Sequence, residues 1–188
     1  MDKLRPKTYE EFLEKFRLTV PATYNFAYDF LDKADPKAPA MVHVDNDGNR
    51  RELDFAWFQE RSSRLADSLQ ARGIGKGDRV MLILYRRLEF WESMLALHKL
   101  GALPIPSPSL LTPHDIEFRV NFAHVKAVIT EDSVAPRVAE AHPKCPGLSL
   151  LVQVGARPKD QGWSAYEDLM AQGQPSFPRP ADAAGGHD

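Results

Sequence analysis

Two adjacent arginines, Arg86 and Arg87, are the first residues whose types and position could do chemistry. They follow an apolar run at residues 79–84, which is expected to be a strand covered on both faces. Ligands of open α/β sheets gather at the carboxyl ends of strands, where guanidinium groups can bind anions. The alternative is a solvent-exposed loop in which the arginines pair with Glu89. The sequence favours the loop and leaves the anion site open.

A glycine-rich run at residues 73–78 has the residue types of a phosphate loop, but its place in the chain is unsuitable. Phosphate loops follow a strand and open a helix, so that helix N–H groups face the anion. This run follows a predicted helix and precedes a predicted strand. We therefore interpret it as a helix end with Gly73 in the left-handed conformation, and as no nucleotide site.

Two further places could meet a ligand. The loop at residues 104–110 combines prolines with small residues, among them Ser107 and Pro108, so a ligand or another segment could approach its backbone closely. A rigid turn braced by its prolines is the alternative. Arg137 follows another predicted strand, and a guanidinium can hold a phosphate with two hydrogen bonds. An exposed helical arginine without a ligand is the alternative there.

Other catalytic signatures are missing from the sequence. The six histidines and the single Cys145 show no metal-ligand spacing. Neither a GxSxG elbow nor a GxxxxGK[ST] phosphate loop occurs. We therefore predict no catalytic residue and no metal ligand in this chain.

The elements that must position these residues alternate between strands and helices. Asp54 and Thr112 stand where helix N-caps are expected, and Asp47-Gly48 is typical of a hairpin turn. Near the N-terminus, a capping box at residues 8–11 and a cap at Thr23 predict two helices. The further predicted elements are a hairpin at 41–53, helices at 54–73, 88–100, 112–119 and 134–142, strands at 79–84, 125–130 and 148–154, and a short helix capped by Ser164. This order predicts an α/β fold with a largely parallel sheet flanked by helices.

Composition excludes some classes of protein. The formal net charge of −2, with scattered lysines and arginines, predicts no nucleic-acid partner. The apolar runs are too short to span a bilayer, and the charged N-terminus does not resemble a signal peptide. A single cysteine fits a reducing compartment, so a cytoplasmic location is expected. Residues 1–171 are predicted to form one incomplete domain, and residues 172–188, rich in proline and glycine, a flexible linker or tail.

The order and spacing of these elements resemble the N-terminal part of the adenylate-forming (AMP-binding) acyl-CoA synthetases, and most of all the medium-chain acyl-CoA and acetyl-CoA synthetase branch. The resemblance covers about residues 21–170. The segments that carry it are residues 24–27 (YNFA), 77–80 (GDRV), 89–91 (EFW), 101–102 (GA), 105–106 (IP), 111–119 (LTPHDIEFR) and 126–130 (KAVIT).

The resemblance implies a two-step reaction in the parent enzyme. A carboxylate attacks ATP to give an acyl-adenylate and pyrophosphate, and CoA then displaces AMP; ATP, Mg²⁺ and CoA are the cofactors implied. It places Ser107, Pro108 and Arg137 near CoA. The family's phosphate loop and catalytic lysine are not in this chain, so we expect an inactive N-terminal fragment of a fatty-acid-metabolising ligase that needs no cofactor by itself.

Two other interpretations stay open at this point. The chain could be a free-standing binding or self-association module, forming a homo-oligomer through exposed apolar surface. A Rossmann-type nucleotide binder fits the alternation of strands and helices but lacks the glycine fingerprint.

Overall fold

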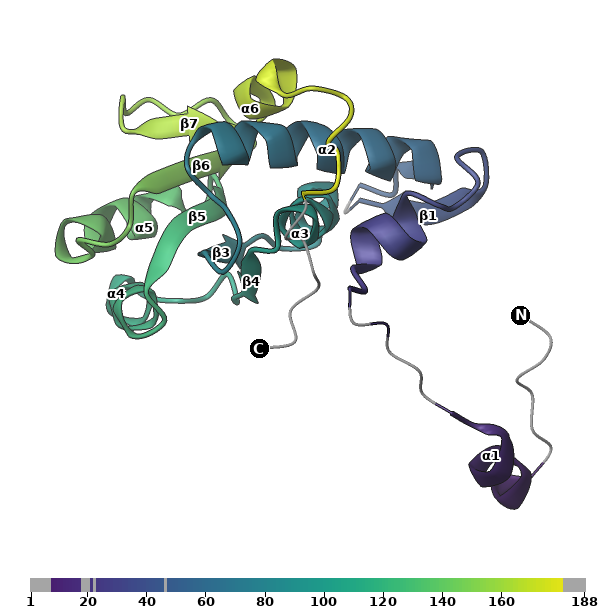
Figure 1. Cartoon of the computed structure of the whole chain (residues 1–188). Coiled ribbons are helices and arrows are strands. Elements are labelled where there is room, and N and C mark those ends of the chain that lie inside the picture. Colours follow the sequence, from purple (N-terminus) through teal and green to yellow (C-terminus); the bar gives the residue numbers. More distant parts are fainter. Residues whose placement is uncertain (1–7, 18–20, 22, 46, 181–188) are drawn as a thin grey trace.

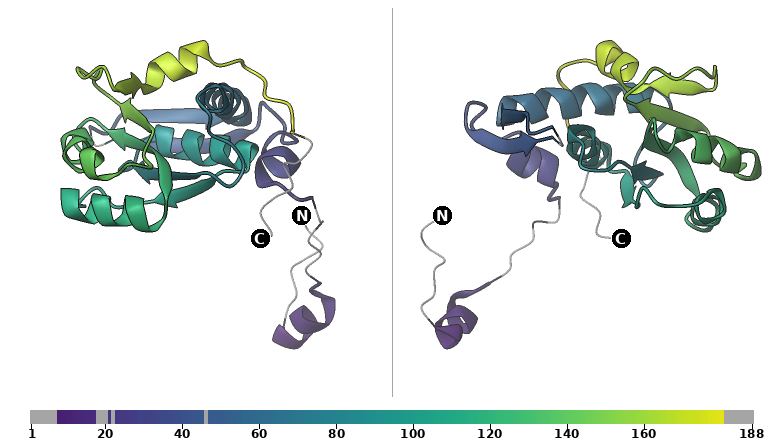
Figure 2. Two further views of the ribbon diagram at one scale, coloured as in Figure 1. Left: turned by 60° about the vertical axis from the view of Figure 1, so that its left-hand side comes forward. Right: turned by 180° about the vertical axis from the view of Figure 1, so that it is seen from behind.

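A five-stranded parallel sheet forms the centre of the molecule, with helices on both faces (Figure 1; Figure 2). The structure is a computed structural model that describes residues 8–17, 21, 23–45 and 47–180. The strands of the sheet, in their order across it, are β4 (Leu103–Pro106), β3 (Arg79–Ile83), β5 (Val125–Glu131), β6 (Leu150–Val154) and β7 (Trp163–Ala165). The predicted parallel sheet flanked by helices is confirmed.

The helices divide between the two faces of the sheet. Helices α2 (Phe55–Ala71), α3 (Leu88–Leu100) and α6 (Tyr166–Gln172) pack on one face, and α4 (Pro113–Phe122) and α5 (Ala135–Ala141) on the other. Along β3, Val80 and Leu82 join the first core and Met81 and Ile83 the second. A strand buried on both faces needs apolar side chains at every position, which explains the unbroken apolar run.

The remaining elements lie outside the central sheet. The predicted hairpin is present as β1 (Pro39–Val44) and β2 (Arg50–Asp54), and Gly48 in its turn has φ +84°. The other elements are α1 (Tyr9–Lys15), the π-helix η2 (Ala27–Leu31) and the 3₁₀ helix η3 (His142–Lys144). In every view α1 lies apart from the rest of the molecule. Among the described residues no helix is both long and apolar enough to cross a membrane.

Local signals in the sequence set the helix ends. Asp54 caps α2 by accepting a hydrogen bond from the backbone N–H of Trp57 at 2.9 Å. Gly73 has φ +84°, and the N–H of Ile74 closes the helix end on the carbonyl of Leu69 at 3.0 Å. Residues 73–78 therefore end a helix and lead into β3, as predicted.

Thr112 and Asp115 form a reciprocal capping box at the start of α4. Because α4 packs on the sheet through Ile116 and Val120, we expect Thr112→Ala to lower the free energy of unfolding by about 1 kcal/mol. Urea denaturation followed by circular dichroism measures this loss. Thr8→Ala is the matched control, since Thr8 caps α1, which has no buried residue. An equal loss in both variants would contradict the prediction.

Two of the expected helix caps are wrong. Thr23 does not cap η2, whose N-cap is Phe26; Oδ1 of Asn25 accepts hydrogen bonds from the N–H groups of Ala27 and Tyr28. Residues 163–165 form β7, so Ser164 lies in a strand and caps no helix.

Helix α3 combines an exposed aromatic side chain with buried charged ones. Trp91 is 50% exposed. The side chains of Glu92 and Lys99 are instead almost fully buried. Their partners come from other elements, which no pattern within the helix can reveal.

Part of the predicted linker at 172–188 lies against the body of the protein. The segment 173–180 follows α6 and crosses α2 (Figure 1). Nη1 of Arg64 donates to the carbonyl of Gly173 at 2.9 Å, and Phe177 is buried in the core. Residues 181–188 lie outside the described residues, so the domain boundary at 171 and the flexibility of the tail stay predictions.

Candidate functional site

The carboxyl edge of the parallel sheet is the candidate site. Strand β3 lies between β4 and β5. It leads into α3 on one face of the sheet, whereas β5 leads into α5 on the other. Loops that leave neighbouring strands in opposite directions open a crevice between them, and this is where ligands of such sheets bind. The loops after β3 and β4, and helix α5 after β5, carry the residues singled out in the sequence.

Arg87 links the two strands across this switch. Its Nε lies 3.3 Å from Oε2 of Glu131, and its Nη2 lies 3.9 Å from Oδ1 of Asp132. The sequence had offered Glu89 as the acidic partner; the structure places the acids after β5 instead. Arg87 is therefore an ion-paired residue at the crevice, as the loop alternative has it, but its partners are Glu131 and Asp132 and not Glu89.

Arg86 adopts an unusual backbone conformation. Its φ is +49°, in the left-handed region that a residue with a β-carbon seldom occupies. The guanidinium lies over the ring of Tyr85, 5.1 Å from the centroid, and the carbonyl oxygen is 3.2 Å from Nε2 of His43. Within the described ranges Arg86 makes no ion pair. A cation of this kind at a strand end is available to an anionic partner.

The structure brings Arg137 against the loop that contains Ser107 and Pro108. Its Nη1 donates to the carbonyl of Leu111 and its Nη2 to the carbonyl of Ser109, each at 2.7 Å. The N–H of Ser107 extends the parallel ladder by donating to the carbonyl of Leu82 at 2.8 Å. Arg137 thus braces the loop, and its remaining N–H groups are free to meet a further acceptor. Contact of these residues with CoA stays a prediction.

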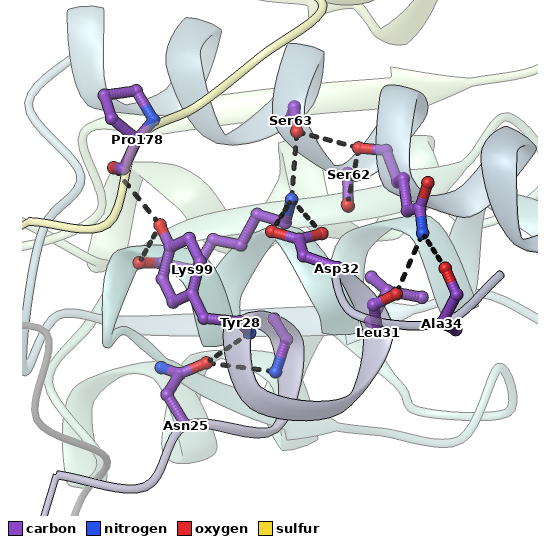
Figure 3. A network of polar contacts seen from close by, with 11 residues as sticks. Asn25, Tyr28, Leu31, Asp32, Ala34, Ser62, Ser63, Lys99 and Pro178 are labelled. Atoms are coloured by element: carbon purple, nitrogen blue, oxygen red, sulfur yellow. Dashed lines mark hydrogen bonds and ion pairs between the residues drawn. The ribbon is translucent and has the colours of Figure 1, made fainter. Parts of the chain in front are cut away.

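Sequence reasoning missed a buried lysine near the opposite end of α3. Nζ of Lys99 lies 2.8 and 3.0 Å from the carboxylate oxygens of Asp32 and 2.9 Å from Oγ of Ser63 (Figure 3). Burial lowers the pKa of Lys99, while the hydrogen bond that its ammonium group donates to Asp32 acts in the opposite direction. The cluster joins η2, α2 and α3, and the three acceptors satisfy the ammonium group, so its role is structural.

A second missed cluster surrounds Glu92. Its carboxylate accepts hydrogen bonds from Tyr166 Oη at 2.7 Å, from Trp57 Nε1 at 3.2 Å and from Arg61 Nε. Burial raises the pKa of Tyr166 well above its ordinary value, and Glu92 adds to this shift, so the phenol stays protonated and donates. The cluster fastens α6 and α2 to α3. The sequence held one signal for both clusters: Glu92 and Lys99 are charged residues within the otherwise largely apolar helix α3.

No group of three or more histidine, cysteine, aspartate or glutamate side chains stands ready for a metal ion in the described part of the chain. The features that remain for a ligand are backbone loops, hydroxyl groups and guanidinium groups. These suit phosphate, carboxylate and amide groups of a ligand.

A doubly covered parallel sheet with a ligand crevice at its switch point defines an α/β ligand-binding domain. Residues 31–185 match the family model described as AMP-binding enzyme. The chain therefore belongs to the AMP-binding enzyme family, as its resemblance predicted.

Known proteins agree with this assignment. The chain is 35% identical over 167 residues to the mitochondrial acyl-coenzyme A synthetase ACSM5 of Rattus norvegicus, with 83% of this chain and 28% of that protein covered. It is 32% identical over 173 residues to mitochondrial ACSM3 of Pongo abelii, covering 86% and 29%. The fold matches the crystal structure of the anthranilate CoA ligase AuaEII in complex with anthranoyl-AMP, with a TM-score of 0.75 at 22% identity, covering 86% and 30%. The chain thus spans less than a third of the length of each.

Proposed function

We propose that this chain is the N-terminal portion of an ATP-dependent acyl-CoA synthetase. The parent enzyme converts a carboxylate, ATP and CoA to acyl-CoA, AMP and pyrophosphate through an acyl-adenylate. The observation that carries the proposal is the family match over residues 31–185 together with the ACSM relatives, which cover most of this chain. An acid–thiol ligase needs ATP and CoA, and Mg²⁺ to offset the triphosphate charge.

The role of this portion follows from its carboxyl edge. In the proposal, Ser107 and Pro108 lie beside the pantetheine arm of CoA, and Arg137 meets a CoA phosphate. The bonds from Arg137 to the carbonyls of Ser109 and Leu111 support this, because they hold cation and loop in one unit. A guanidinium held in this way loses less conformational entropy when it binds a phosphate.

The chain by itself is expected to be inactive. It offers neither a glycine-rich phosphate loop after a strand nor a metal cluster among its described residues, so nothing stabilises the triphosphate during adenylation. We expect no carboxylate-dependent pyrophosphate release from the purified chain with ATP, Mg²⁺ and carboxylates of several lengths.

A coupled pyrophosphate assay tests this expectation, with human ACSM5 under the same conditions as the positive control. Pyrophosphate release that depends on added carboxylate and exceeds the rate without protein would overturn it. Pyrophosphate release that does not depend on the carboxylate would point to a contaminating enzyme that hydrolyses ATP to AMP and pyrophosphate, and would leave the expected inactivity standing.

Four further expectations from the sequence belong to this proposal. They are a role in fatty acid metabolism, a cytoplasmic location, the lack of a nucleic-acid partner and the formation of a homo-oligomer. The two named ACSM relatives are mitochondrial, so the location needs its own test in the cell. No observation favours the free-standing module over the synthetase portion.

A further inference from the structure

The outer side of helix α4 carries an exposed aromatic pair. Ile116 and Val120 are buried against the sheet. Phe118 and Phe122 each stand two positions further along, which is about 200° around an α-helix, so they point away from the sheet. They are 61% and 77% exposed, and their rings stack with centroids 5.7 Å apart. Helix α4 lies at the outside of the molecule (Figure 1; Figure 2), where such a pair is typical of an interaction surface.

This surface is held in a fixed position. The capping box fixes the start of α4, and near its end Nδ2 of Asn121 donates to the carbonyl of Lys144 at 3.1 Å. Leu110 precedes the helix and is 88% exposed. Arg137 holds the carbonyls on either side of Leu110, so this loop is fixed as well. A surface that is already ordered loses little conformational entropy when it binds a partner.

The charges of α4 differ between its two ends. Asp115 lies in the first turn and Arg119 in the last turn. Glu117 lies between them and pairs with Lys144 at 3.4 Å. Two copies of this helix packed side by side in the same direction would bring acid against acid. In the antiparallel direction the acidic end of each copy meets the basic end of the other, and the helix dipoles oppose each other. The helix is therefore complementary to itself when antiparallel.

We propose that this chain forms a two-fold symmetric dimer in which α4 packs antiparallel against α4 of a second copy. Phe118 lies at the symmetry axis against its own counterpart. Arg119 faces the partner's Glu117, and Phe122 covers the start of the partner's helix. A two-fold interface uses the same patch on both copies, so one self-complementary helix is sufficient. The inference assigns a surface to the homo-oligomer of the proposed function and does not depend on the synthetase activity.

The size of the patch sets the strength of the dimer. The exposed parts of Leu110, Phe118 and Phe122 amount to roughly 400 Å² per copy, since a large aromatic side chain covers about 150–250 Å². A stable interface of standard size buries about 800 Å² per partner. We therefore expect a reversible dimer with a Kd of roughly 0.1 mM, and not a permanent one.

Sedimentation equilibrium of the whole purified chain tests the proposal. Over about 10 µM to 1 mM, a range that brackets this Kd, the average mass should rise from one chain toward two. Phe118→Asp is expected to weaken the dimer at least about tenfold, because it places a charge at the centre of the interface. Phe12→Asp is the matched control: Phe12 belongs to a similar stacked and exposed pair in α1. Circular dichroism checks that both variants keep the fold.

A pair of charge reversals tests the antiparallel arrangement. Arg119→Glu alone puts two acids against each other, and Glu117→Arg alone puts two bases together, so each variant should dimerise more weakly than the unaltered chain. An equimolar mixture of the two should associate at least about tenfold more tightly than either alone, because every pair is then of opposite charge. Loss of the surface pair between Glu117 and Lys144 costs little stability.

Three results would each overturn the proposal. They are a chain that stays monomeric over the whole concentration range, an equal loss of association in Phe118→Asp and Phe12→Asp, and a mixture of the charge reversals that associates no better than its components. The first would leave α4 to another partner, and the second would move the interface away from α4. None of these results bears on pyrophosphate release, so the two proposals fail separately.

Discussion

Replacing Lys99 by methionine is expected to lower the free energy of unfolding by about 1–3 kcal/mol, because Asp32 and Ser63 lose the buried ammonium group that donates to them while the Asp32 side chain, 29% exposed, keeps part of its hydration. Lys99 is 1% exposed and bonds to both carboxylate oxygens of Asp32 and to Ser63. Methionine fills most of the volume but leaves the carboxylate without its cation. Figure 3 shows how the ammonium group joins the three helical elements.

Two further variants distinguish loss of the Lys99–Asp32 ion pair from the loss of any lysine charge. Lys33→Met removes a lysine that pairs with Asp29 at the surface, and we expect little change from it. The double variant Lys99→Met with Asp32→Leu removes both charges, and it should be more stable than Lys99→Met alone. Urea unfolding of these three variants and of Asp32→Leu alone measures the effect. A double variant as unstable as the sum of its single changes would contradict a coupled pair.

The second large effect is expected at Gly173, where the chain passes closely over α2. A β-carbon built on Gly173 would lie 1.9 Å from the carbonyl oxygen of Arg64 and 2.6 Å from its carbonyl carbon. Both are backbone atoms, so a rotamer change cannot relieve the clash. We expect Gly173→Ala to displace residues 173–180 and to lower the free energy of unfolding by about 1–3 kcal/mol.

Gly147→Ala is the matched control, because nothing lies within 4 Å of a β-carbon there and its φ is not positive. Limited proteolysis reports the displacement directly. Earlier cleavage around residue 173 in Gly173→Ala, with unchanged cleavage in Gly147→Ala, is the expected result. Similar digestion of both variants would show that the segment does not depend on this close approach.

Local rules made most of the secondary structure predictable. The caps at Asp54 and Thr112 and the left-handed glycine at 73 depend on a few neighbouring residues, and each is confirmed. The two wrong predictions also concern helix caps. Thr23 and Ser164 have suitable side chains near a helix start, but Asn25 accepts the hydrogen bonds at the start of η2, and Ser164 lies in strand β7.

The sequence could predict which residues lie at the candidate site, but not the contacts between them. The sequence placed Ser107, Pro108 and Arg137 after strands, which is enough to assign them to one edge of a parallel sheet. It could not show that Arg137 holds the carbonyls of Ser109 and Leu111, because these partners lie 28 and 26 positions away in the sequence.

By itself, the sequence determined the alternation of strands and helices, the turns and the kind of enzyme to which the chain is related. Short-range periodicity and capping encode these features, because a strand or a helix end needs only its own neighbourhood. The tertiary structure alone decided that β3 lies between β4 and β5, and that Arg87 pairs with Glu131. It also decided that Lys99 is buried against Asp32, 67 positions away. Such pairings depend on which elements pack together, and no local pattern carries that information.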